Sequence, residues 1–374
     1  MTLQVACQAC DAVHRSDTRL WRCGCGAALD VGFQGAIDVD AIGRRPPGMW
    51  RYREALPIGA DAHVVSFNEG FTPVVRMQFD GKPLSVKQEN LFPTGSFKDR
   101  GASVLISRAL ELGVEKVVED SSGNAGAAVA AYAAKAGIEC EIYVPESTSP
   151  GKLAQIRLYG ANLIRVPGSR EDTARAAMEA AESHFYASHV WNPFFFQGTK
   201  TYAFEIWEQL DFSAPDTLIV PTGHGTMLIG AFLGFRDLLE NGLIARLPRM
   251  IAVQAAGCAP LYRMWRDQSA NLAPVDSSGT IAEGIAIAEP TRASQILDIV
   301  HETGGRIVAV TDAEIERALL DICKQGLYAE PTSATAVAAF RKIPTERDEC
   351  IVAPLTGHGL KSTEKLLKLT EGQE

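Results

Sequence analysis

The sequence of 374 residues contains a lysine, Lys98, in the segment Pro93-Thr-Gly-Ser-Phe-Lys-Asp-Arg-Gly101, at the start of a helical pattern that runs to about Leu112. Thr94 or Ser96 is a suitable N-cap, so Lys98 is predicted to lie in the first helical turn. The helix dipole disfavours a cation there, and apolar surroundings would favour the neutral amine further. A neutral lysine amine forms Schiff bases with aldehydes. The alternative is that Lys98 is an ordinary solvated lysine at a helix start, and the other motifs decide between these two interpretations.

Three glycine-rich turns elsewhere in the chain are candidate ligand sites, because each follows a strand pattern. Ser121-Ser-Gly-Asn-Ala-Gly126 precedes a helical pattern at 127–135, so its backbone N–H groups can bind an anion such as a carboxylate. The amide of Asn124 can hydrogen-bond a neighbouring oxygen. Taken alone, such a string is more often a tight turn with a helix cap.

The second turn, Pro221-Thr-Gly-His-Gly-Thr226, can close around an anion at the start of a helical pattern at 227–238, which favours phosphate. It is not a nucleotide P-loop, because no Gly-Lys-Ser/Thr follows, and its glycine spacing differs from a dinucleotide-binding fingerprint. The third turn, Leu355-Thr-Gly-His-Gly-Leu-Lys361, offers the hydroxyl of Thr356 to a ring nitrogen. A reactive lysine, a carboxylate site, a phosphate cradle and a hydroxyl are together what pyridoxal phosphate requires.

Alternating strand and helix patterns predict the elements that position these turns. The fold class is α/β: we expect two open, mostly parallel sheets with helices on both faces and ligands at the carboxyl ends of the strands. A capping box at Thr311-Asp-Ala-Glu314 marks one helix start. Residues 63–67 also resemble a strand, and 50–57 a short helix or arm. The other strand candidates are 84–87, 116–119, 139–144, 162–166, 217–220, 250–254, 306–310 and 350–354.

Four of the eight cysteines lie near the N-terminus. The pairs Cys7, Cys10 and Cys23, Cys25 have the layout of two thiolate hairpins in a small zinc ribbon. A single residue separates the second pair, rather than the commoner two, so a metal-free ribbon is an equal alternative to a zinc site. The cysteines at 140, 258, 323 and 350 lie in or beside apolar segments and are predicted to be buried core residues.

Composition is that of an ordinary globular protein, with 46% apolar and 22% charged residues. The net charge of −9 and the lack of a dense Lys/Arg run argue against nucleic-acid or acidic-membrane partners and favour a small-molecule ligand. The apolar stretch 125–134 is too short to span a bilayer, and the N-terminus lacks the features of a secretory signal. We therefore expect a cytoplasmic protein without disulfides.

These motifs give the chain a resemblance to threonine synthases, which belong to the tryptophan-synthase-β-like group (fold type II) of pyridoxal-phosphate enzymes. The resemblance covers nearly the whole chain and is more specific for the fold and the cofactor than for the substrate. It implies two α/β domains with the cofactor in the cleft between them, and a homodimer. Besides the cysteines and the segments already described, it rests on Glu69-Gly-Phe-Thr-Pro, Gly151-Lys-Leu-Ala-Gln, Lys200-Thr-Tyr-Ala-Phe-Glu-Ile and Glu330-Pro-Thr-Ser-Ala.

The predicted domains are a cysteine-containing N-terminal module at 1–34, a larger α/β cofactor domain at 35–95 and 200–374, and a smaller α/β domain at 96–199. The resemblance implies that Lys98 carries the cofactor and acts as the base at the α-carbon, and that Asn124 bonds the phenolic oxygen. It implies a carboxylate site at Ser122, Gly123, Asn124 and Ala125, a phosphate site at Gly223, His224, Gly225, Thr226 and Met227, and Thr356 at the pyridine nitrogen. A hydroxyl cannot keep that nitrogen protonated as a carboxylate would, which favours loss of a leaving group at the β- or γ-carbon over transamination.

The substrate implied by the resemblance is O-phosphohomoserine, which loses phosphate and gains water to give threonine. Threonine synthases typically have Asn-Pro-Tyr-Arg and Thr-Ile-Ala-Thr-Ala-Ile-Arg where this chain has Asn192-Pro-Phe-Phe195 and Thr280-Ile-Ala-Glu-Gly-Ile-Ala286. Phe195 and Ala286 thus replace two arginines, at least one of which is expected to hold the substrate's phosphate. A threonine or serine dehydratase, or a β-replacing synthase with a different substrate, is the alternative. A non-catalytic protein that binds pyridoxal phosphate is a minor one.

Overall fold

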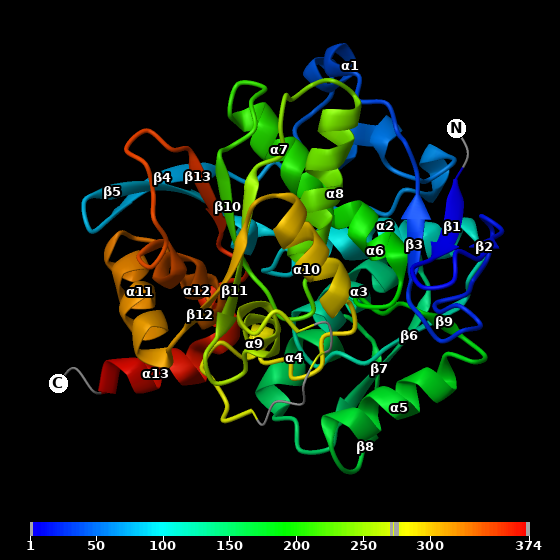
Figure 1. The fold of residues 1–374 in the computed structure, drawn as a ribbon. Coiled ribbons are helices and arrows are strands. Elements are labelled where there is room, and N and C mark those ends of the chain that lie inside the picture. The colour runs from blue at the N-terminus through cyan, green and yellow to red at the C-terminus, as the bar shows by residue number, and fades with distance from the viewer. Residues whose placement is uncertain (1–2, 270–271, 273–276, 372–374) are drawn as a thin grey trace. The chain divides into compact units, whose positions relative to one another are not determined.

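The computed structural model describes residues 3–269, 272 and 277–371 and divides into two compact units (Figure 1). Unit 1 consists of Met1–Phe71 and Lys98–Thr201, and unit 2 of Thr72–Phe97 and Tyr202–Glu374. The chain passes from one unit to the other directly before Lys98. Among the described residues, no helix is long and apolar enough to cross a membrane.

Unit 1 is built on a four-stranded parallel sheet with the strand order β8-β7-β6-β9. Alternate residues of β6 face opposite sides: Val117 lies in the core with helix α3, whereas Val118 packs in a second cluster with Ala177 of α5. Helices therefore cover both faces of this sheet, as predicted. The strands are β6 (Lys116–Glu119), β7 (Glu139–Pro145), β8 (Asn162–Val166) and β9 (Phe185–Tyr186), and the helices are α2 (Lys98–Glu111), α3 (Asn124–Ala136), α4 (Pro150–Leu158), α5 (Arg170–Ala180) and α6 (Pro193–Thr199).

The N-terminal part of unit 1 begins with a three-stranded antiparallel sheet, β2-β1-β3, and continues through short helical segments. Val5 and Leu29 of the small sheet are buried in the same core as α2 and α3. The elements are β1 (Gln4–Cys7), β2 (Val13–His14), β3 (Leu29–Gly32), α1 (Val39–Arg44) and the 3-10 segments η1 (Met49–Ala55) and η2 (Asp61–His63).

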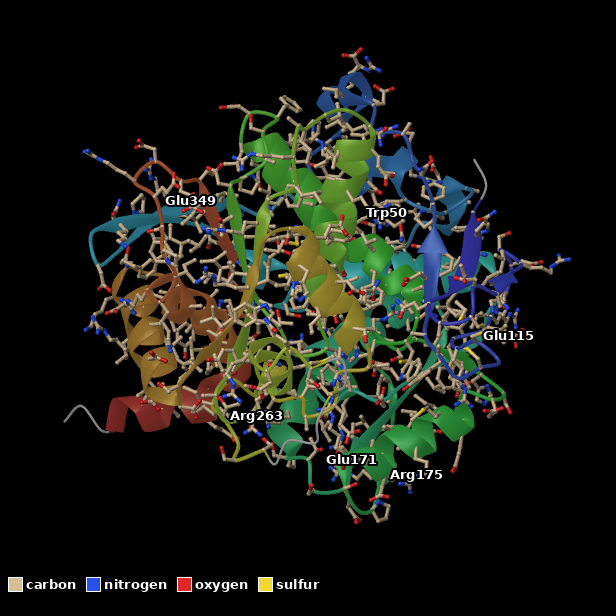
Figure 2. All side chains as sticks on the ribbon, viewed as in Figure 1. Trp50, Glu115, Glu171, Arg175, Arg263 and Glu349 are labelled. Carbon is tan, nitrogen blue, oxygen red and sulfur yellow. The ribbon has the colours of Figure 1, made fainter. Side chains whose placement is uncertain are left out.

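Residues 35–71 group with unit 1, although the sequence assigned them to the larger α/β domain. Their polar groups find partners on α2: Trp50 Nε1 donates to Ser103 Oγ at 2.9 Å (Figure 2), and Val65 N donates to Ser107 Oγ at 2.8 Å. The second of these bonds also explains why the strand predicted at 63–67 is wrong. This segment leaves η2 as an irregular chain whose backbone bonds a helix side chain rather than a strand.

Unit 2 is built on a six-stranded sheet with the strand order β12-β11-β10-β13-β5-β4. All neighbours are parallel except β4 and β5. The central strand β10 is buried along its whole length, as expected of a parallel strand covered on both faces. The strands are β4 (Val74–Phe79), β5 (Lys82–Lys87), β10 (Thr217–Pro221), β11 (Arg249–Ala255), β12 (Arg306–Val310) and β13 (Ile351–Pro354).

Helices cover the sheet of unit 2 as well. Ile219 and Ile251 share a core with α11 and α12, which pack side by side (Figure 1), while α8 and α10 pack against β10 and β11. The predicted capping box is confirmed, because Thr311 and Glu314 bond each other's backbone N–H at the start of α11. The helical segments are η3 (Glu89–Leu91), α7 (Thr201–Gln209), α8 (Thr226–Glu240), α9 (Pro260–Arg266), η4 (Glu283–Ile285), α10 (Ala293–Glu302), α11 (Asp312–Lys324), α12 (Pro331–Phe340), η5 (Gly359–Ser362) and α13 (Thr363–Glu371).

Candidate active site

Lys98 is the first residue of α2 and is half-buried, so the predicted position in the first helical turn is confirmed. Its Nζ lies 5.7 Å from the ring centroid of Phe195, which is fully buried in α6. The electron-rich face of that ring favours the ammonium form of the lysine, in opposition to the helix dipole. Ser96, one of the two predicted N-caps, does not act as one: its buried Oγ has no hydrogen-bond partner among the described residues.

Two glycines allow the backbones of helices α2 and α6 to approach each other closely. A Cβ added at Gly198 would lie 1.9 Å from the carbonyl oxygen of Arg100, and one at Gly101 would lie 2.2 Å from the ring of Phe195. Helix α2, which carries Lys98, is therefore packed closely against α6 within the first turn after that lysine. Phe194, Phe195 and Phe196 are all buried, so this aromatic run belongs to the core.

The Ser121–Gly126 turn links β6 to α3 in the same unit as Lys98. Helix α3 begins at Asn124, and its N-cap Gly123 makes no side-chain cap bond, so the amides of the first turn are not satisfied by a cap. A Cβ at Gly126 would lie 1.8 Å from the carbonyl oxygen of Ser121, so no larger residue fits there. Ser122 and Asn124 are half-buried, Gly123 is exposed and Ala125 is buried. This arrangement suits a small anion such as a carboxylate.

The turn after β10, which the sequence predicts to bind phosphate, lies in unit 2. Gly225 is the N-cap of α8 with φ of 80°, a conformation that favours glycine, and a Cβ there would lie 2.4 Å from Ile296. A Cβ at Gly223 would lie 2.9 Å from a side-chain carbon of Ile287. Thr226 and Met227 form the first turn of α8 and are buried, and His224 is half-buried. The loop combines backbone amides at the N-terminus of a long helix with the polar side chains of His224 and Thr226, which suits an anion.

Thr356 is buried in the last glycine turn and lies in a hydroxyl–carboxyl cluster. Its Oγ1 donates to Glu330 Oε1 at 2.7 Å and lies 3.0 Å from Ser333 Oγ. The same turn binds the segment that precedes Lys98, because Phe97 N donates to the Thr356 carbonyl at 3.1 Å. Glu330 and Ser333 were noted in the sequence as part of a motif, but without a role. Glu330 and Thr356 are 26 residues apart, so their contact could not be predicted from the sequence.

A protein-family model described as "Pyridoxal-phosphate dependent enzyme" matches residues 65–357 of the chain. The chain belongs to this family. It is a pyridoxal-phosphate-dependent lyase that is similar to threonine synthases.

Members of the family resemble the chain along most of its length. It is 37% identical to a threonine synthase of Methanocaldococcus jannaschii over 98% of this chain and 94% of the relative. It is 36% identical to a threonine synthase of Mycobacterium leprae over 85% and 89%. Among solved structures, a maize serine racemase matches with a TM-score of 0.69 and 24% identity, covering 90% of this chain and 99% of the racemase. A threonine deaminase of Solanum lycopersicum matches with a TM-score of 0.70 and 23% identity, covering 91% and 92%. At these identities the solved structures show a common fold.

The side chains of this family member fit pyridoxal phosphate. The cofactor needs an amine for its aldehyde, an anion site for its phosphate and a partner for its ring nitrogen. Lys98 offers an amine at a helix start, the tightly enclosed Gly223–Met227 loop offers backbone amides at the N-terminus of α8, and Thr356 offers a buried hydroxyl.

The four N-terminal cysteines come together, as predicted. The Sγ atoms of Cys7, Cys10, Cys23 and Cys25 all lie within 4.8 Å of one another, with 3.5 Å between Cys7 and Cys25 and 3.7 Å between Cys10 and Cys23. The remaining cysteines follow the core prediction in part. Cys140 and Cys258 are buried, whereas those at 323 and 350 are half-buried. Burial raises the pKa of the Cys140 thiol to about 12.

Several other residues noted in the sequence have structural partners. Glu283 forms an ion pair with Lys365 at 2.8 Å on a solvent-exposed face. His358 Nδ1 accepts from Leu360 N at 3.2 Å and so caps η5. Ala286 follows η4 and is half-buried. One pair was missed: fully buried Glu119 lies against His189 in unit 1. The available signal was a carboxylate at the end of an apolar strand, immediately before the Ser121–Gly126 turn.

Proposed function

We propose that the enzyme is a threonine synthase, which converts O-phosphohomoserine and water to threonine and phosphate. The bond between the γ-carbon and the phosphate oxygen breaks, and phosphate leaves with the bonding electrons. Water supplies a hydroxyl to the β-carbon, which loses a proton, and the γ-carbon ends as a methyl group. The observation that carries this proposal is the similarity to threonine synthases, at 34–37% identity, across 98% of the chain in two of them.

We assign each functional group of the cofactor to residues of this chain. Lys98 would hold its aldehyde carbon, Asn124 its phenolic oxygen, the residues from Gly223 to Met227 its phosphate, and Thr356 its ring nitrogen. When bound, pyridoxal phosphate supplies an electron sink for negative charge that develops at the substrate's α-carbon.

The chain's own groups would carry out the remaining work. Ser122, Gly123, Asn124 and Ala125 would bind and orient the substrate carboxylate through the amides at the start of α3. Lys98, once freed, would remove the proton from the α-carbon and return it later. Proton transfer by a positioned side chain typically contributes about 10²–10⁴ in rate.

A dehydratase acting on threonine or serine is the second candidate, and the core position of Phe195 favours it. This residue is fully buried against Gly101, so its site holds a packed ring where an arginine was expected to bind the substrate's phosphate. An arginine fork suits phosphate and an aromatic ring does not. A non-phosphorylated amino acid would need no such group.

A substrate panel distinguishes the two candidates. Purified, cofactor-loaded enzyme is given O-phosphohomoserine, threonine and serine, and phosphate, ammonia, keto acid and amino acids are measured together. Phosphate release with threonine formation supports the synthase. Ammonia and keto acid from threonine or serine, with phosphohomoserine inert, would replace it by the dehydratase. Lys98→Ala is the control for cofactor-dependent turnover, and borohydride reduction should place a pyridoxyl group on Lys98.

We also propose a structural zinc ion at the four N-terminal cysteines. Tetrahedral zinc with Zn–S bonds of about 2.3 Å requires sulfurs about 3.8 Å apart. The cluster already has Sγ separations of 3.5 and 3.7 Å. One equivalent of zinc by elemental analysis, lost in Cys10→Ser, is expected. Full-length protein purified without chelator that contains no zinc would favour the metal-free ribbon.

A homodimer in the cytoplasm completes the proposal, by analogy with the resemblance described above. Light scattering coupled to gel filtration should give twice the chain mass of 40.3 kDa. A mass equal to one chain at micromolar concentration would contradict it.

A further inference from the structure

A buried glutamate and a buried histidine lie at the carboxyl edge of the sheet in unit 1. Glu119 is the last residue of β6, and His189 follows β9. These two strands pair in parallel, with Val118 opposite Tyr186, so their ends reach the same edge. Ligands of open α/β sheets bind at this edge. His189 Nδ1 lies 2.8 Å from Glu119 Oε1.

Only half of the carboxyl group of Glu119 is satisfied by the described residues. Its side chain is 0% exposed, and its second oxygen, Oε2, is buried without a hydrogen-bond partner among them. A buried, unsatisfied acceptor costs about 1–3 kcal/mol, so such a group is seldom retained without a role. In the tautomer with a proton on Nδ1, the histidine ring donates to the first oxygen, which favours the ionised carboxylate and opposes the burial that raises the pKa of Glu119.

Lys98 and the pair share one aromatic ring. The ring centroid of Phe195 lies 5.7 Å from Lys98 Nζ and 6.1 Å from the centroid of the His189 ring. Burial and the charge of Asp120 raise the pKa of Glu119 well above its ordinary value, and the positive charge of Lys98 opposes this rise. The lysine and the carboxyl group are therefore electrostatically linked.

Titratable groups on β7, β9, α2 and α3, and one directly after β6, also lie near Glu119, His189 and Lys98. Directly after β6, Asp120 adds negative charge and accepts a hydrogen bond from the Tyr186 hydroxyl of β9 at 2.9 Å, and burial raises its pKa against the lowering effect of the charge of Arg170. From β7, the Cys140 thiol and Glu141 lie nearby, and from α3 the Tyr132 hydroxyl faces the start of α2. Asp99 and Arg100 flank Lys98 and are both fully buried. Among the carboxyl groups of this set, that of Glu119 is distinguished by a buried oxygen without a hydrogen-bond partner in the described part of the chain.

We propose that Glu119 and His189 form a positioning pair for Lys98, in which the carboxylate, held ionised by the histidine N–H, stabilises the ammonium form of the lysine. This inference deepens the proposed function and rests on it for the role of Lys98 as a base. The proton that Lys98 takes from the α-carbon stays on Nζ, while the carboxylate balances the new charge without itself being protonated. The Glu119–His189 pair thus raises the pKa of Lys98 and makes it a stronger base, without itself contacting the substrate.

The ionisation of Lys98 can be measured without substrate or turnover. The full-length chain, stripped of cofactor, is labelled with trace acetic anhydride across a range of pH, and the label on Lys98 is quantified by peptide mass spectrometry. Only the neutral amine reacts, so the labelling curve gives its midpoint. Glu119→Gln should lower this midpoint by about one unit, which means about tenfold faster labelling at pH values below it.

The histidine provides a matched pair of variants. His189→Ala removes the donor to Glu119 and should lower the midpoint of Lys98 in the same direction. His189→Asn keeps an N–H near the position of Nδ1 and should restore it. A role in packing alone would not predict this rescue. Because only position 189 changes, the comparison holds even if Glu119→Gln does not fold.

Asp120→Asn is the control for general electrostatics, since it removes a neighbouring half-buried carboxyl that accepts a hydrogen bond from Tyr186. Its midpoint should remain near that of the native chain. Equal shifts in Asp120→Asn and Glu119→Gln, or no shift in Glu119→Gln and His189→Ala, would overturn the proposal. A second readout is the pH dependence of the visible absorbance of the loaded chain, which should move with the labelling midpoint.

The test separates this inference from the proposed function. A failed substrate panel with a shifted labelling midpoint would reject the synthase and keep the pair. A borohydride label on a lysine other than Lys98 would reject the assigned base while leaving the electrostatic link intact. An unshifted midpoint with normal threonine formation would reject the pair alone.

Discussion

Gly198→Ala is expected to destabilise unit 1 at the crossing of α2 and α6. The added methyl would lie 1.9 Å from the Arg100 carbonyl oxygen, 2.7 Å from its carbonyl carbon and 2.9 Å from Gly101 Cα. Ordinary contacts begin at 3.4 Å. Because all three atoms belong to the backbone, no side chain can rotate away, and the two helices must separate by more than an ångström.

The magnitude follows from two opposing effects. Overpacking of a close-packed core costs about 1–3 kcal/mol, and a clash between backbones lies at the upper end of that range. Alanine recovers about 1 kcal/mol of helix propensity over glycine. The net loss in the free energy of unfolding should therefore be about 2 kcal/mol. Since α2 carries Lys98, the affinity for pyridoxal phosphate should fall as well.

Urea unfolding followed by circular dichroism measures this loss, and Gly43→Ala is its matched control. Gly43 lies in helix α1 with no atom within 4 Å of an added Cβ, so alanine there should stabilise the chain by up to about 1 kcal/mol. A second comparison uses Gly101, where the clash is with the Phe195 ring. Phe195→Leu should partly rescue Gly101→Ala and should not rescue Gly198→Ala. Equal stability of the Gly198 and Gly43 variants would refute the reasoning.

Three further predictions concern buried charge. Lys87 and Glu205 form an ion pair at 2.9 Å with both side chains 0% exposed, so Lys87→Met should lower the free energy of unfolding in urea by about 3–5 kcal/mol. The double variant with Glu205→Leu should recover most of this. Phe195→Arg would place a charge in a fully buried site and should lower the melting temperature, rather than improve the use of a phosphorylated substrate. Burial raises the pKa of Asp120 above its ordinary 3.8, so the folded state binds its proton more tightly and loses stability as pH rises above that value. Asp120→Asn should therefore be more stable than the native chain near neutral pH, with the difference vanishing below about pH 4 in urea titrations.

Much of the α/β framework could be predicted because the local patterns are strong. Strands predicted at 116–119, 162–166 and 306–310 coincide with β6, β8 and β12, and the other candidates after residue 83 agree within two residues. These strands are apolar and β-branched and alternate with helical periods. β9 was missed because two residues carry no periodic signal.

The glycine-rich turns of the candidate site could be predicted from the sequence, but the tertiary contacts around them could not. Each glycine motif follows a strand, which is a local rule. By contrast, Glu119 and His189 are 70 residues apart, and Phe195 packs on Gly101 across two helices. Such contacts depend on strand order and helix crossing, neither of which a linear pattern contains. The grouping of residues 35–71 with α2 was missed for the same reason.

The hydrogen bonds around Thr356 determine whether a further partner of its hydroxyl must be a donor or an acceptor. Threonine has one hydroxyl proton, and Glu330 accepts it at 2.7 Å. Ser333, at 3.0 Å, must then act as a donor, which leaves a single lone pair on the threonine oxygen. Any further partner has to bring its own proton, so a pyridine nitrogen could bond Thr356 only in its protonated form. This differs from the sequence-based expectation, in which the hydroxyl meets a nitrogen that is not kept protonated. The uncharged side chain of Thr356 is therefore the middle member of a hydrogen-bonded chain that ends in a carboxylate. Glu330 determines whether the Thr356 hydroxyl donates to a further partner or accepts from it.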